Sequence, residues 1–363
     1  MKMTMKRLFY FLAVAALLLT GQDRCSAQTR SQKYVIGFYN LENLFDIYDD
    51  PAKNDEEFLP DGKNKWTAAK YKKKLHNMAQ VIRAMHDDNG CWHTVLGISE
   101  IENRMVVEDL VSDPQISAAN YQIVHYDGPD RRGVDVGLLY DPKKFGYINS
   151  ESIPFTFEGS KVAITLDKEA QDYFRTRDIL MVHGVIGGEH FAIYVCHLPS
   201  RLGGKGADLR CRGAEIIYNH SLKMEEKYPG IKVVVMGDMN DNPTDDSQAV
   251  WLRGRENLKD VGEGDFFDPF TSMLKDGYGS LAYRGEWNIY DIVQVNRNLA
   301  LAPNGGLKIQ PIVKNKYYGR IFSKPFMTQQ NGQYKGTPFR TFSNGAFIGG
   351  YSDHYPTYIV ISK

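Results

Sequence analysis

Cysteine is scarce in this sequence of 363 residues, which contains four of them. Cys25 lies in an N-terminal segment that we expect to be removed, which leaves Cys91, Cys196 and Cys211. Three thiols can form at most one intramolecular disulfide, and no cysteine and histidine stand at the spacing of a zinc site. We therefore expect a fold that depends on neither a disulfide framework nor structural zinc.

The sequence has no internal repeat and no low-complexity tract. Its 33 glycines and 15 prolines follow no fixed period, which excludes collagen-like chains, solenoids and coiled coils and indicates many turns between strands. Hydrophobic residues make up 42% and charged residues 24%, as in ordinary globular proteins, so a disordered chain is also excluded. The composition favours a strand-rich mixed fold, and the length allows either two domains or one large layered domain.

Neither sign of charge is in excess. The sequence contains 44 basic and 44 acidic residues, of which four basic and one acidic lie in the first 27 positions, so the remainder carries 40 positive and 43 negative charges, a net charge of −3. A protein that holds long stretches of nucleic acid through many phosphate contacts usually has a positive field. The charge balance therefore disfavours processive or structural DNA binding, although it leaves room for a local basic groove.

The N-terminus has the pattern of a secretory signal. Residues 8–19 form an apolar run of 12 residues, which is too short to span a bilayer, and three basic residues precede it. Small residues up to Ala27 offer a cleavage site, and the residues before Cys25 are not those that lipid attachment requires. The alternative is a retained anchor helix. We predict that residues 1–27 are a signal peptide and that residues 28–363 form a single domain, periplasmic or secreted, without stable membrane insertion after cleavage.

Nine short apolar or aromatic stretches are predicted to be strands. They are residues 34–40, 93–99, 121–126, 134–140, 179–186, 190–198, 231–236, 289–295 and 355–361. Helices are predicted at 66–86, 207–226 and 247–253, and loop-rich insertions near 46–65 and 303–345. Because runs such as 95–99 and 231–236 are apolar without alternation, we expect their strands to be covered on both faces. Two sheets packed face to face, with helices outside, meet that requirement.

The predicted helix 66–86 has one apolar face. Between Tyr71 and Met85, apolar residues recur at spacings of four, three, four and three. The same stretch contains Lys70 and the run Lys72–Lys74, which we place largely on the solvated side of the helix. A run of lysines on a helix more often forms a solvated face than a binding site for a polyanion.

Polar residues gather at or near the ends of the predicted strands. They are Asn40, Glu42, Glu100, His197, Asp238, Asn240, Asp291, Asp353 and His354. Each alone is most often a turn residue or a helix cap. Taken together they indicate one shared site. Asp238 and Asn240 stand on one side of an extended chain and can act on one ligand, and oxygen donors such as Glu100 suit Mg²⁺. Mg²⁺ keeps positions for water and substrate phosphate, so the set indicates phosphoryl transfer.

Seven short motifs occur in a characteristic order. They are FYNLENLFD at 38–46, ISE at 98–100, RRGVDVGLLY at 131–140, CHLPSR at 196–201, GDMND at 237–241, YDIV at 290–293 and SDH at 352–354. In this order and spacing the sequence, from about residue 34 to 361, resembles a secreted bacterial-type member of the endonuclease/exonuclease/phosphatase superfamily, which has the deoxyribonuclease I-like fold. The resemblance implies an α+β fold, a four-layer α/β/β/α sandwich with two mixed sheets.

The same resemblance implies a role for each polar residue. Asn40 and Glu100 match metal-binding residues, and Glu42 and Asp353 match further carboxylates near the metal. Catalytic roles are implied for His197, Asp238, Asn240, Asp291 and His354. Of these, Asp238 would orient or deprotonate the attacking water and Asn240 would steady the phosphate. His197 would lie near the leaving oxygen, and His354, paired with Asp291, would contact the phosphate. The metal would be Mg²⁺, with Mn²⁺ or Ca²⁺ as alternatives, and which histidine donates a proton stays open.

Basic residues near the motifs are candidates for substrate binding. Arg201 and Lys205 lie in a glycine-rich stretch that continues to Arg210 and Arg212, and such a loop could hold phosphates that flank the scissile one, or could simply be solvated. Arg131, Arg132 and Asp135 could contact substrate or pair with one another across a turn.

Other residues near the motifs are expected to be structural. Asn43, Asp46 and Glu102 are expected to cap helices or brace loops. Cys196 precedes His197, so its thiol should face the core if the histidine faces the cleft.

Three functions follow from these observations. The first is an exported, Mg²⁺-dependent phosphodiesterase that acts on nucleic acid, most simply as a monomer. The second keeps the metal site but acts on a phosphomonoester, a nucleotide or a phospholipid head group. The third is a non-catalytic binding protein on the same scaffold, which is disfavoured because every matched position has a chemically competent residue.

Overall fold

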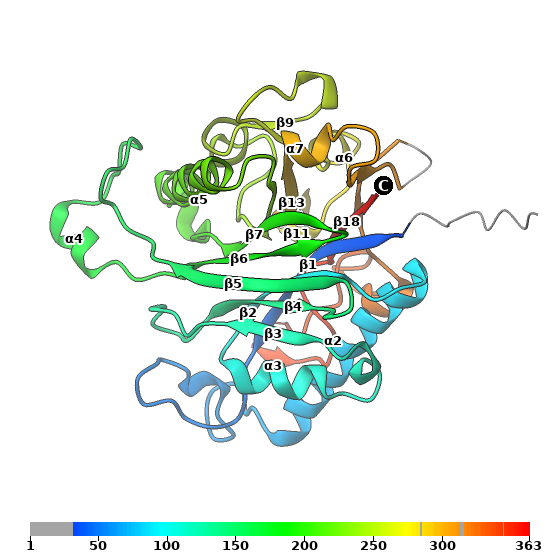
Figure 1. Cartoon of the computed structure of the whole chain (residues 1–363). Coiled ribbons are helices and arrows are strands. Elements are labelled where there is room, and N and C mark those ends of the chain that lie inside the picture. Colours follow the sequence, from blue (N-terminus) through cyan, green and yellow to red (C-terminus); the bar gives the residue numbers. More distant parts are fainter. Residues whose placement is uncertain (1–31, 284, 313–315, 344) are drawn as a thin grey trace, which may run out of the picture. The chain divides into compact units, whose positions relative to one another are not determined.

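Two mixed β-sheets lie face to face in the computed structural model, which describes residues 32–283, 285–312, 316–343 and 345–363 (Figure 1). The elements below belong to one unit, Lys33–Lys363. The signal peptide predicted at residues 1–27 lies outside the described residues. Within the part that is described, no helix is both long and apolar enough to cross a membrane.

The first sheet contains seven strands. In spatial order they are β14 (Lys308–Gln310), β18 (Thr357–Ser362), β1 (Tyr34–Leu44), β2 (Val95–Ile101), β4 (Asp135–Tyr140) and β3 (Gln122–His125), with β15 (Gly319–Ile321) also paired to β18. Strands β1 and β2 are parallel, and the remaining pairs are antiparallel. The insertion predicted near 303–345 thus contributes two edge strands to this sheet.

The second sheet also contains seven strands. In spatial order they are β5 (Phe145–Ile153), β6 (Ile179–Ile186), β7 (Glu189–His197), β8 (Lys232–Asp238), β13 (Asp291–Asn296), β10 (Phe266–Phe267) and β9 (Gly254–Arg255). The pairs β7–β8 and β9–β10 are parallel. Two small hairpins stand apart, β11 (Leu281–Tyr283) with β12 (Glu286–Asn288), and β16 (Phe342–Ser343) with β17 (Ala346–Phe347).

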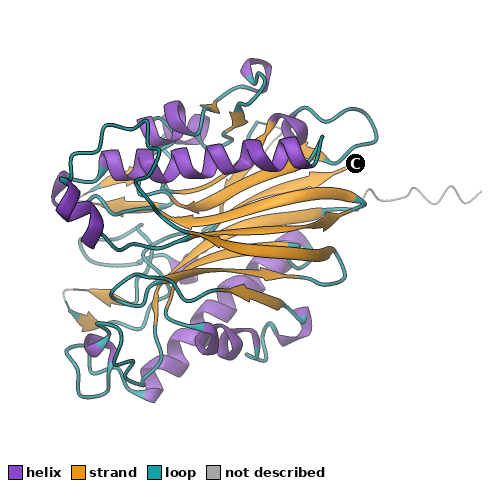
Figure 2. Ribbon diagram, turned by 60° about the vertical axis from the view of Figure 1, so that its left-hand side comes forward, coloured by secondary structure: helices purple, strands orange, loops and turns teal. Residues whose placement is uncertain are grey.

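Helices form the two outer layers (Figure 2). On the first sheet, α2 (Ala68–Asn89) packs against β1, and α3 (Arg104–Val111) packs against β2 and β3. On the second sheet, α5 (Ala207–Lys227) packs against β7, and α7 (Arg297–Ala300) contacts β8, β10 and β13. The predicted four-layer α/β/β/α sandwich with mixed sheets is therefore confirmed. Shorter helical elements are α4 (Lys168–Tyr173), α6 (Thr271–Lys275), five 3-10 turns (Glu56–Phe58, Ser117–Ala119, Leu202–Gly204, Leu258–Asp260 and Pro325–Met327) and one π-helical turn (Ser247–Trp251).

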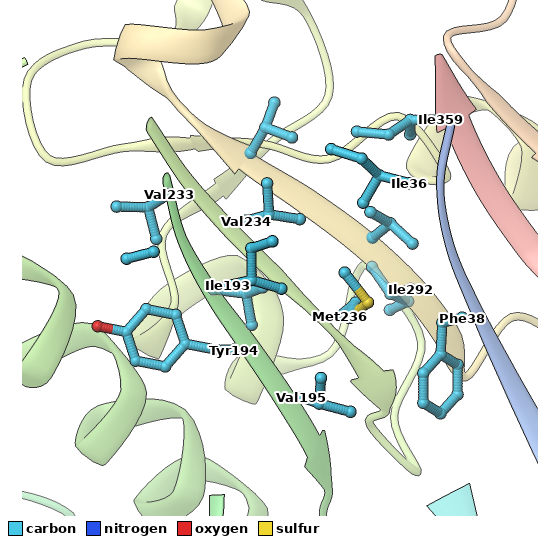
Figure 3. Packing of buried hydrophobic residues seen from close by; sticks show 14 of the residues in the cluster. Ile36, Phe38, Ile193, Tyr194, Val195, Val233, Val234, Met236, Ile292 and Ile359 are labelled. Carbon is cyan, nitrogen blue, oxygen red and sulfur yellow. The ribbon is translucent and has the colours of Figure 1, made fainter. Parts of the chain in front are cut away.

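The space between the sheets is filled by one face of each central strand. Figure 3 shows Ile36 and Phe38 of β1 beside the second sheet, in the same core cluster as Ile193, Val234 and Met236 of that sheet. Alternate residues of β1, such as Val35 and Tyr39, belong instead to the core beneath α2. The sheets approach closely at Gly97 of β2, where a Cβ atom would lie 2.6 Å from Met236 Sδ.

Most predicted elements are present in the structure. All nine predicted strands and the helices at 66–86 and 207–226 are present to within a few residues, and the helix predicted at 247–253 is the π-helical turn Ser247–Trp251. Strand β5, helices α3 and α4 and several shorter elements were not predicted. Strand β5 was not predicted because most of its residues are exposed and it has no continuous apolar run, as is common in an edge strand. The placement of the whole lysine run in solvent was wrong for Lys74, which is fully buried.

Candidate active site

The apolar face between the sheets ends in polar residues at one end of the strands. Asn40 follows Phe38 on the inner face of β1, His197 follows Val195 on β7, and Asp238 follows Met236 on β8. The register places His197 and Asp291 on either side of Asp238 in the second sheet. Strand pairing and the alternation of side chains therefore bring together residues from distant parts of the chain.

Asn40 joins the two sheets through its side-chain amide. Its Nδ2 donates to Glu100 Oε1 at 3.1 Å and to Asp238 Oδ2 at 3.0 Å, while its Oδ1 accepts the backbone N–H of Glu42 at 2.8 Å. Glu100 also accepts from the backbone N–H of Asn43. Asn40 was predicted as a metal ligand, but in this orientation it turns its donor toward the carboxylates. Its oxygen would reach a metal only if the amide rotated.

Glu100, His197 and Asp238 can surround one metal ion. His197 Nε2 lies 3.9 Å from Glu100 Oε1 and 3.6 Å from Asp238 Oδ2, and one ligand atom from each of the three residues lies within 4.8 Å of the others. Two carboxylates and an imidazole are suitable ligands for a hard or borderline divalent cation. The side chain of Glu100 is 19% exposed and those of the other two are nearly covered, so a site held by this group would open to solvent at Glu100.

His354 faces the same group from the other side. Its Nδ1 lies 2.7 Å from Asp291 Oδ2, and its Nε2 lies 3.9 Å from Asp238 Oδ2 and 3.9 Å from Asp353 Oδ1. Asp291 is completely buried, and the same oxygen also accepts a hydrogen bond from the Ser280 hydroxyl at 2.6 Å. This pairing directs Nε2 of His354 toward the site.

The two histidines have opposite electrostatic environments. Burial and the nearby Arg177 and Arg132 hold the pKa of His197 well below its usual range. Burial would also lower the pKa of His354, but the charges of Asp291, Asp238 and Asp353 outweigh it and raise that pKa well above its usual range. The structure therefore favours a neutral His197 and a cationic His354, which is the separation that acid and base roles in one site require.

Asp238 is held in place by hydrogen bonds to both of its oxygens. Asn40 donates to Oδ2, and the backbone N–H of Asn240 donates to Oδ1 at 3.0 Å. Burial raises the pKa of Asp238, and the charges of Asp291 and Glu100 add to this effect against the opposing cation of His354. The Asn240 side chain donates to the carbonyl of Leu198 at 3.0 Å, so it fixes the loop after β7 in the present arrangement.

The backbone of the site is strained. Of the seven described non-glycine residues with a positive φ, four belong to it: Glu42 at 47°, Asn43 at 54°, Glu100 at 58° and Asn240 at 50°. Each such residue costs about 1–3 kcal/mol and persists where the surrounding structure requires it. At Glu100 the left-handed conformation coincides with an irregularity in the register of β2 against β4. The left-handed conformation of Glu100 directs its carboxylate away from the strand and toward Asn40.

Glu42 and Asp353 form a second acidic group, which is bridged by Arg340. Arg340 lies 2.6 Å from Asp353 Oδ2 and 3.6 Å from Glu42 Oε1, and Glu42 Oε2 accepts the backbone N–H of Thr341 at 2.6 Å. Burial and the charge of Asp353 raise the pKa of Glu42. Both carboxylates were predicted near the metal, but Arg340 was not predicted because it lies in a long loop with no motif.

Lys74 reaches the same group from helix α2. It donates to Thr341 Oγ1 and to the carbonyl of Tyr351, the latter at 2.6 Å, and so ties together the two ends of the loop that carries Arg340 and leads to Asp353. Helix α2, which was predicted as a structural element, thus stabilises the loop that leads to Asp353.

The predicted substrate cations differ in their surroundings. Arg201 pairs with Asp245 at 3.2 Å and lies over the Tyr290 ring, Lys205 is exposed, and Arg132 is 55% exposed at 3.7 Å from Asp130. The expected continuation of the basic loop is wrong. Arg210 and Arg212 are buried in α5, where they pair with Asp241 at 2.7 Å and with Glu215 at 2.6 Å.

Asp46 and Glu102 brace loops, as expected, and Cys196 lies in the core. Glu102 accepts the backbone N–H of Asp46, and Asp46 in turn accepts that of Tyr48. The Cys196 thiol is buried beside Met239, and burial raises its pKa. The structure records Cys91, Cys196 and Cys211 as free thiols.

The sequence profile of the Endonuclease/Exonuclease/phosphatase family matches residues 35–363. The chain belongs to this family. With the site described above, it is a metal-dependent hydrolase of phosphate esters. No functionally curated protein is similar enough in sequence to match.

Solved structures share the fold at low sequence identity. A family member from Bacteroides thetaiotaomicron has 13% identity and a TM-score of 0.54, with 92% of this chain and 98% of that chain covered. TDP2 from D. rerio in complex with a single-strand DNA product has 13% identity and a TM-score of 0.53, with 92% and 100% covered. A mannosyl-6-phosphatase from B. thetaiotaomicron has 12% identity and a TM-score of 0.53, with 91% and 100% covered.

Proposed function

We propose that this family member is an exported, Mg²⁺-dependent phosphodiesterase that hydrolyses nucleic acid and works as a monomer. The observation that carries the chemistry is the position of Asp238, which is hydrogen-bonded to Asn40 and has an imidazole on either side, at 3.6 Å from His197 and 3.9 Å from His354. A water-activating carboxylate, two imidazoles and the partly exposed carboxylate of Glu100 meet in one place.

A divalent ion held by Glu100, with Asp238 or His197, would neutralise charge on a non-bridging oxygen of the phosphate. The chain's own groups then have separate tasks. Asp238 takes a proton from the attacking water, because burial raises its pKa and the hydrogen bonds from Asn40 and Asn240 fix its direction.

His354 binds the phosphate and supplies the proton for the leaving oxygen. Its Nδ1 is held by Asp291, so its Nε2–H faces the site and stays charged. In the balanced reaction, the water oxygen forms a bond to phosphorus while the ester P–O bond breaks. One proton passes from water to Asp238, and one passes from His354 to the departing alkoxide.

His197 acts as a neutral group. Burial disfavours its protonated form, and its backbone carbonyl accepts a hydrogen bond from the buried Arg177 at 3.1 Å, which fixes the strand end. A neutral imidazole can bind the metal or accept a hydrogen bond from a water molecule, but it cannot serve as a proton donor of the same strength as His354.

A diester substrate is supported by hollows near both edges of the site. On the side of Asp353 lies a hollow of about 400 Å³, lined by residues that include Gln333, Tyr334 and Arg340. On the side of His197, the neighbouring Arg177 contacts Asp130, which lines a second hollow of about 560 Å³. A phosphodiester places a group on each side of the scissile phosphate, whereas a monoester needs only one.

A phosphomonoesterase acting on a sugar phosphate or nucleotide is the second candidate. The hollow beside Asp353 favours it, because the charged residues that the structure describes in its lining are Arg340 and Asp353, and these pair with each other. Such a lining suits a small, uncharged, hydroxylated group attached to a phosphate.

Three substrates tested side by side distinguish these functions. We expect Mg²⁺-dependent nicking of plasmid DNA and hydrolysis of a bis-aryl phosphodiester, both abolished by Asp238→Asn, with slower hydrolysis of an aryl phosphomonoester. Activity confined to the monoester would establish the second candidate instead. Absence of all three activities in a folded protein would favour a binding role.

Export and oligomeric state are tested on the purified protein. We expect the mature chain to begin at Gln28 in the periplasm or medium, as determined by N-terminal sequencing, and light scattering to give the mass of one chain. A retained N-terminus or a dimer mass would contradict these parts of the proposal.

A further inference from the structure

The hollow on the His197 side is formed by three separate segments of the chain. Its lining consists of Ala52, Lys53, Asn54, Pro129, Asp130, Arg131 and Arg175, and its volume is about 560 Å³. The backbone N–H of Asn54 donates to the carbonyl of Arg131 at 2.7 Å, which joins the loop after β1 to the loop before β4. Two of the segments that line the hollow are therefore held together by a backbone hydrogen bond.

Three cations line this hollow and have no carboxylate partner among the residues that the structure describes. In that part of the chain, eleven of the 14 arginines lie within 4.0 Å of a carboxylate oxygen. Arg131 and Arg175 are two of the three exceptions, and Lys53 likewise has no ion pair within the described ranges. Two of the three unpaired arginines thus line the same hollow.

Backbone carbonyls hold the three cations in place without neutralising them. Lys53 Nζ donates to the carbonyls of Gly128 at 2.7 Å and Asp130 at 3.1 Å, Arg131 donates to that of Tyr173 at 3.2 Å, and Arg175 to those of Asp172 at 2.9 Å and Phe174 at 2.8 Å. Each cation keeps further N–H donors that these bonds do not use.

The one acidic residue of the lining is already engaged. Asp130 Oδ2 lies 3.5 Å from Arg177, and Oδ1 accepts the backbone N–H of Arg132 at 2.9 Å and lies 3.7 Å from the Arg132 guanidinium. The hollow is therefore strongly positive in a chain without excess positive charge. Arg177 also donates to the carbonyls of His197 and Leu198, so Asp130 is connected to the candidate active site through one buried side chain.

We infer that Lys53, Arg131 and Arg175 bind a second phosphate group of the substrate, separate from the phosphate that is hydrolysed. The inference rests on the proposed phosphodiesterase function and makes it more specific, since such a substrate must carry at least two phosphates. Clustered, unpaired Lys and Arg side chains with free donors suit a phosphate dianion or monoanion. The second phosphate is either the next internal phosphate of a strand or a terminal phosphate.

Three short substrates separate these two sources. They are a dinucleotide with one phosphodiester, the same dinucleotide with a terminal phosphate at either end, and a trinucleotide with two phosphodiesters. We expect the second phosphate to lower KM about tenfold, because a charge-assisted contact contributes about 1.4 kcal/mol or more. A gain with the trinucleotide alone identifies an internal phosphate, and a gain with the end-phosphorylated dinucleotide identifies a terminal one.

The double variant Arg131→Gln/Arg175→Gln should remove this gain. It should leave hydrolysis of a bis-aryl phosphodiester, which has only one phosphate, within about twofold of wild type. Arg297→Gln, which removes the remaining unpaired arginine of the described residues on a different element, is the matched control and should keep the gain. A gain that survives the double variant, or equal KM values for all substrates, would overturn the inference while leaving the phosphodiesterase proposal intact.

Binding gives a readout that does not depend on turnover. In an Asp238→Asn background, the affinity for a short single-stranded oligonucleotide should fall with salt. The double variant should reduce the slope of log K against log salt by about 0.7 for each phosphate that is no longer neutralised by an arginine. An unchanged slope would overturn the inference. If the wild-type protein cleaves no diester, the phosphodiesterase proposal fails, and this binding slope still decides whether the hollow binds phosphate.

Discussion

The imidazole of His354 is held by Asp291, whose Oδ2 lies 2.7 Å from Nδ1 and also accepts the Ser280 hydroxyl at 2.6 Å. Both hydrogen bonds are buried, and they leave Nε2 as the ring nitrogen that faces Asp238 and Asp353. The orientation and the charge of His354 therefore depend on a residue that does not itself reach the substrate.

Asp291→Asn should lower kcat for the bis-aryl phosphodiester by about 10²-fold or more, because a positioned proton donor contributes about 10²–10⁴-fold. KM should change much less, since Asp291 acts through His354 as a positioning residue. Steady-state kinetics measure both quantities. The control is Ser280→Ala, which removes one hydrogen bond to Asp291 but leaves its charge, and should lower kcat by less than about tenfold. A variant Asp291→Asn with wild-type kcat would show that His354 needs no such partner.

Lys74→Met should reduce both stability and metal affinity. The substitution leaves the Tyr351 carbonyl and the Thr341 hydroxyl without their buried donor, which costs about 1–3 kcal/mol of the free energy of unfolding. It should also raise the Mg²⁺ concentration for half-maximal activity by about tenfold, because the loop that carries Arg340 loses its support. Urea unfolding and a Mg²⁺ titration measure these changes.

Lys73→Met is the matched control for this prediction. Lys73 precedes Lys74 in helix α2, but its side chain is exposed. We expect this variant to match the wild type in both measurements. Equal effects of the two substitutions would show that charge on the helix, and not the buried contact, is responsible.

His93 should make the protein less stable in acid. Its ring is fully buried, neither nitrogen has a hydrogen-bond partner within the described part of the chain, and burial lowers its pKa to about 3, with smaller contributions from Lys144, His86 and Lys33. The groups around it are the Tyr121 hydroxyl, which accepts its backbone N–H, and the Tyr358 ring. In the unfolded chain its pKa is about 6.5. The unfolded state therefore binds more protons between these two values.

The stability contribution of a neutral His93 is fully present above about pH 6.5 and is lost as the pH falls toward 3. We expect the wild type to lose about 2 kcal/mol of unfolding free energy between pH 7 and pH 5 from this group, at about 1.4 kcal/mol per pH unit below 6.5. Urea unfolding at both pH values tests this. His93→Phe should remove that part of the loss, and His76→Gln, on an exposed histidine of α2, should not. Equal pH dependence in the wild type and His93→Phe would contradict the assignment.

The layers and most of the site could be predicted from the sequence because both depend on strands. Uninterrupted apolar runs require cover on both faces, and a polar residue at the end of such a run, such as Asn40, His197 or Asp238, continues the inner face of its strand. The order of the family motifs then predicts that these strand ends meet.

The parts that could not be predicted depend on loops and on side-chain direction. Arg340, Lys53 and Arg175 lie in segments without periodicity, so nothing in the sequence indicates which carboxylate or hollow they face. The buried position of Lys74 depends on a loop that lies more than 260 residues along the chain. The direction of the Asn40 amide is set by the backbone N–H of Glu42, a contact that exists only in the left-handed turn at that residue.

The proposed reaction requires a divalent ion held at Glu100. The direct test is Mg²⁺ binding by calorimetry, with hydrolysis of the bis-aryl phosphodiester measured on the same samples, for Glu100→Gln and Glu102→Gln. Glu102 is a fair control because it lies two residues away and burial raises its pKa to about 8, so glutamine resembles its neutral form. We predict that Glu100→Gln loses Mg²⁺ binding and lowers activity by about 10³-fold or more, while Glu102→Gln retains both. Undiminished Mg²⁺ binding and turnover in Glu100→Gln would contradict the account.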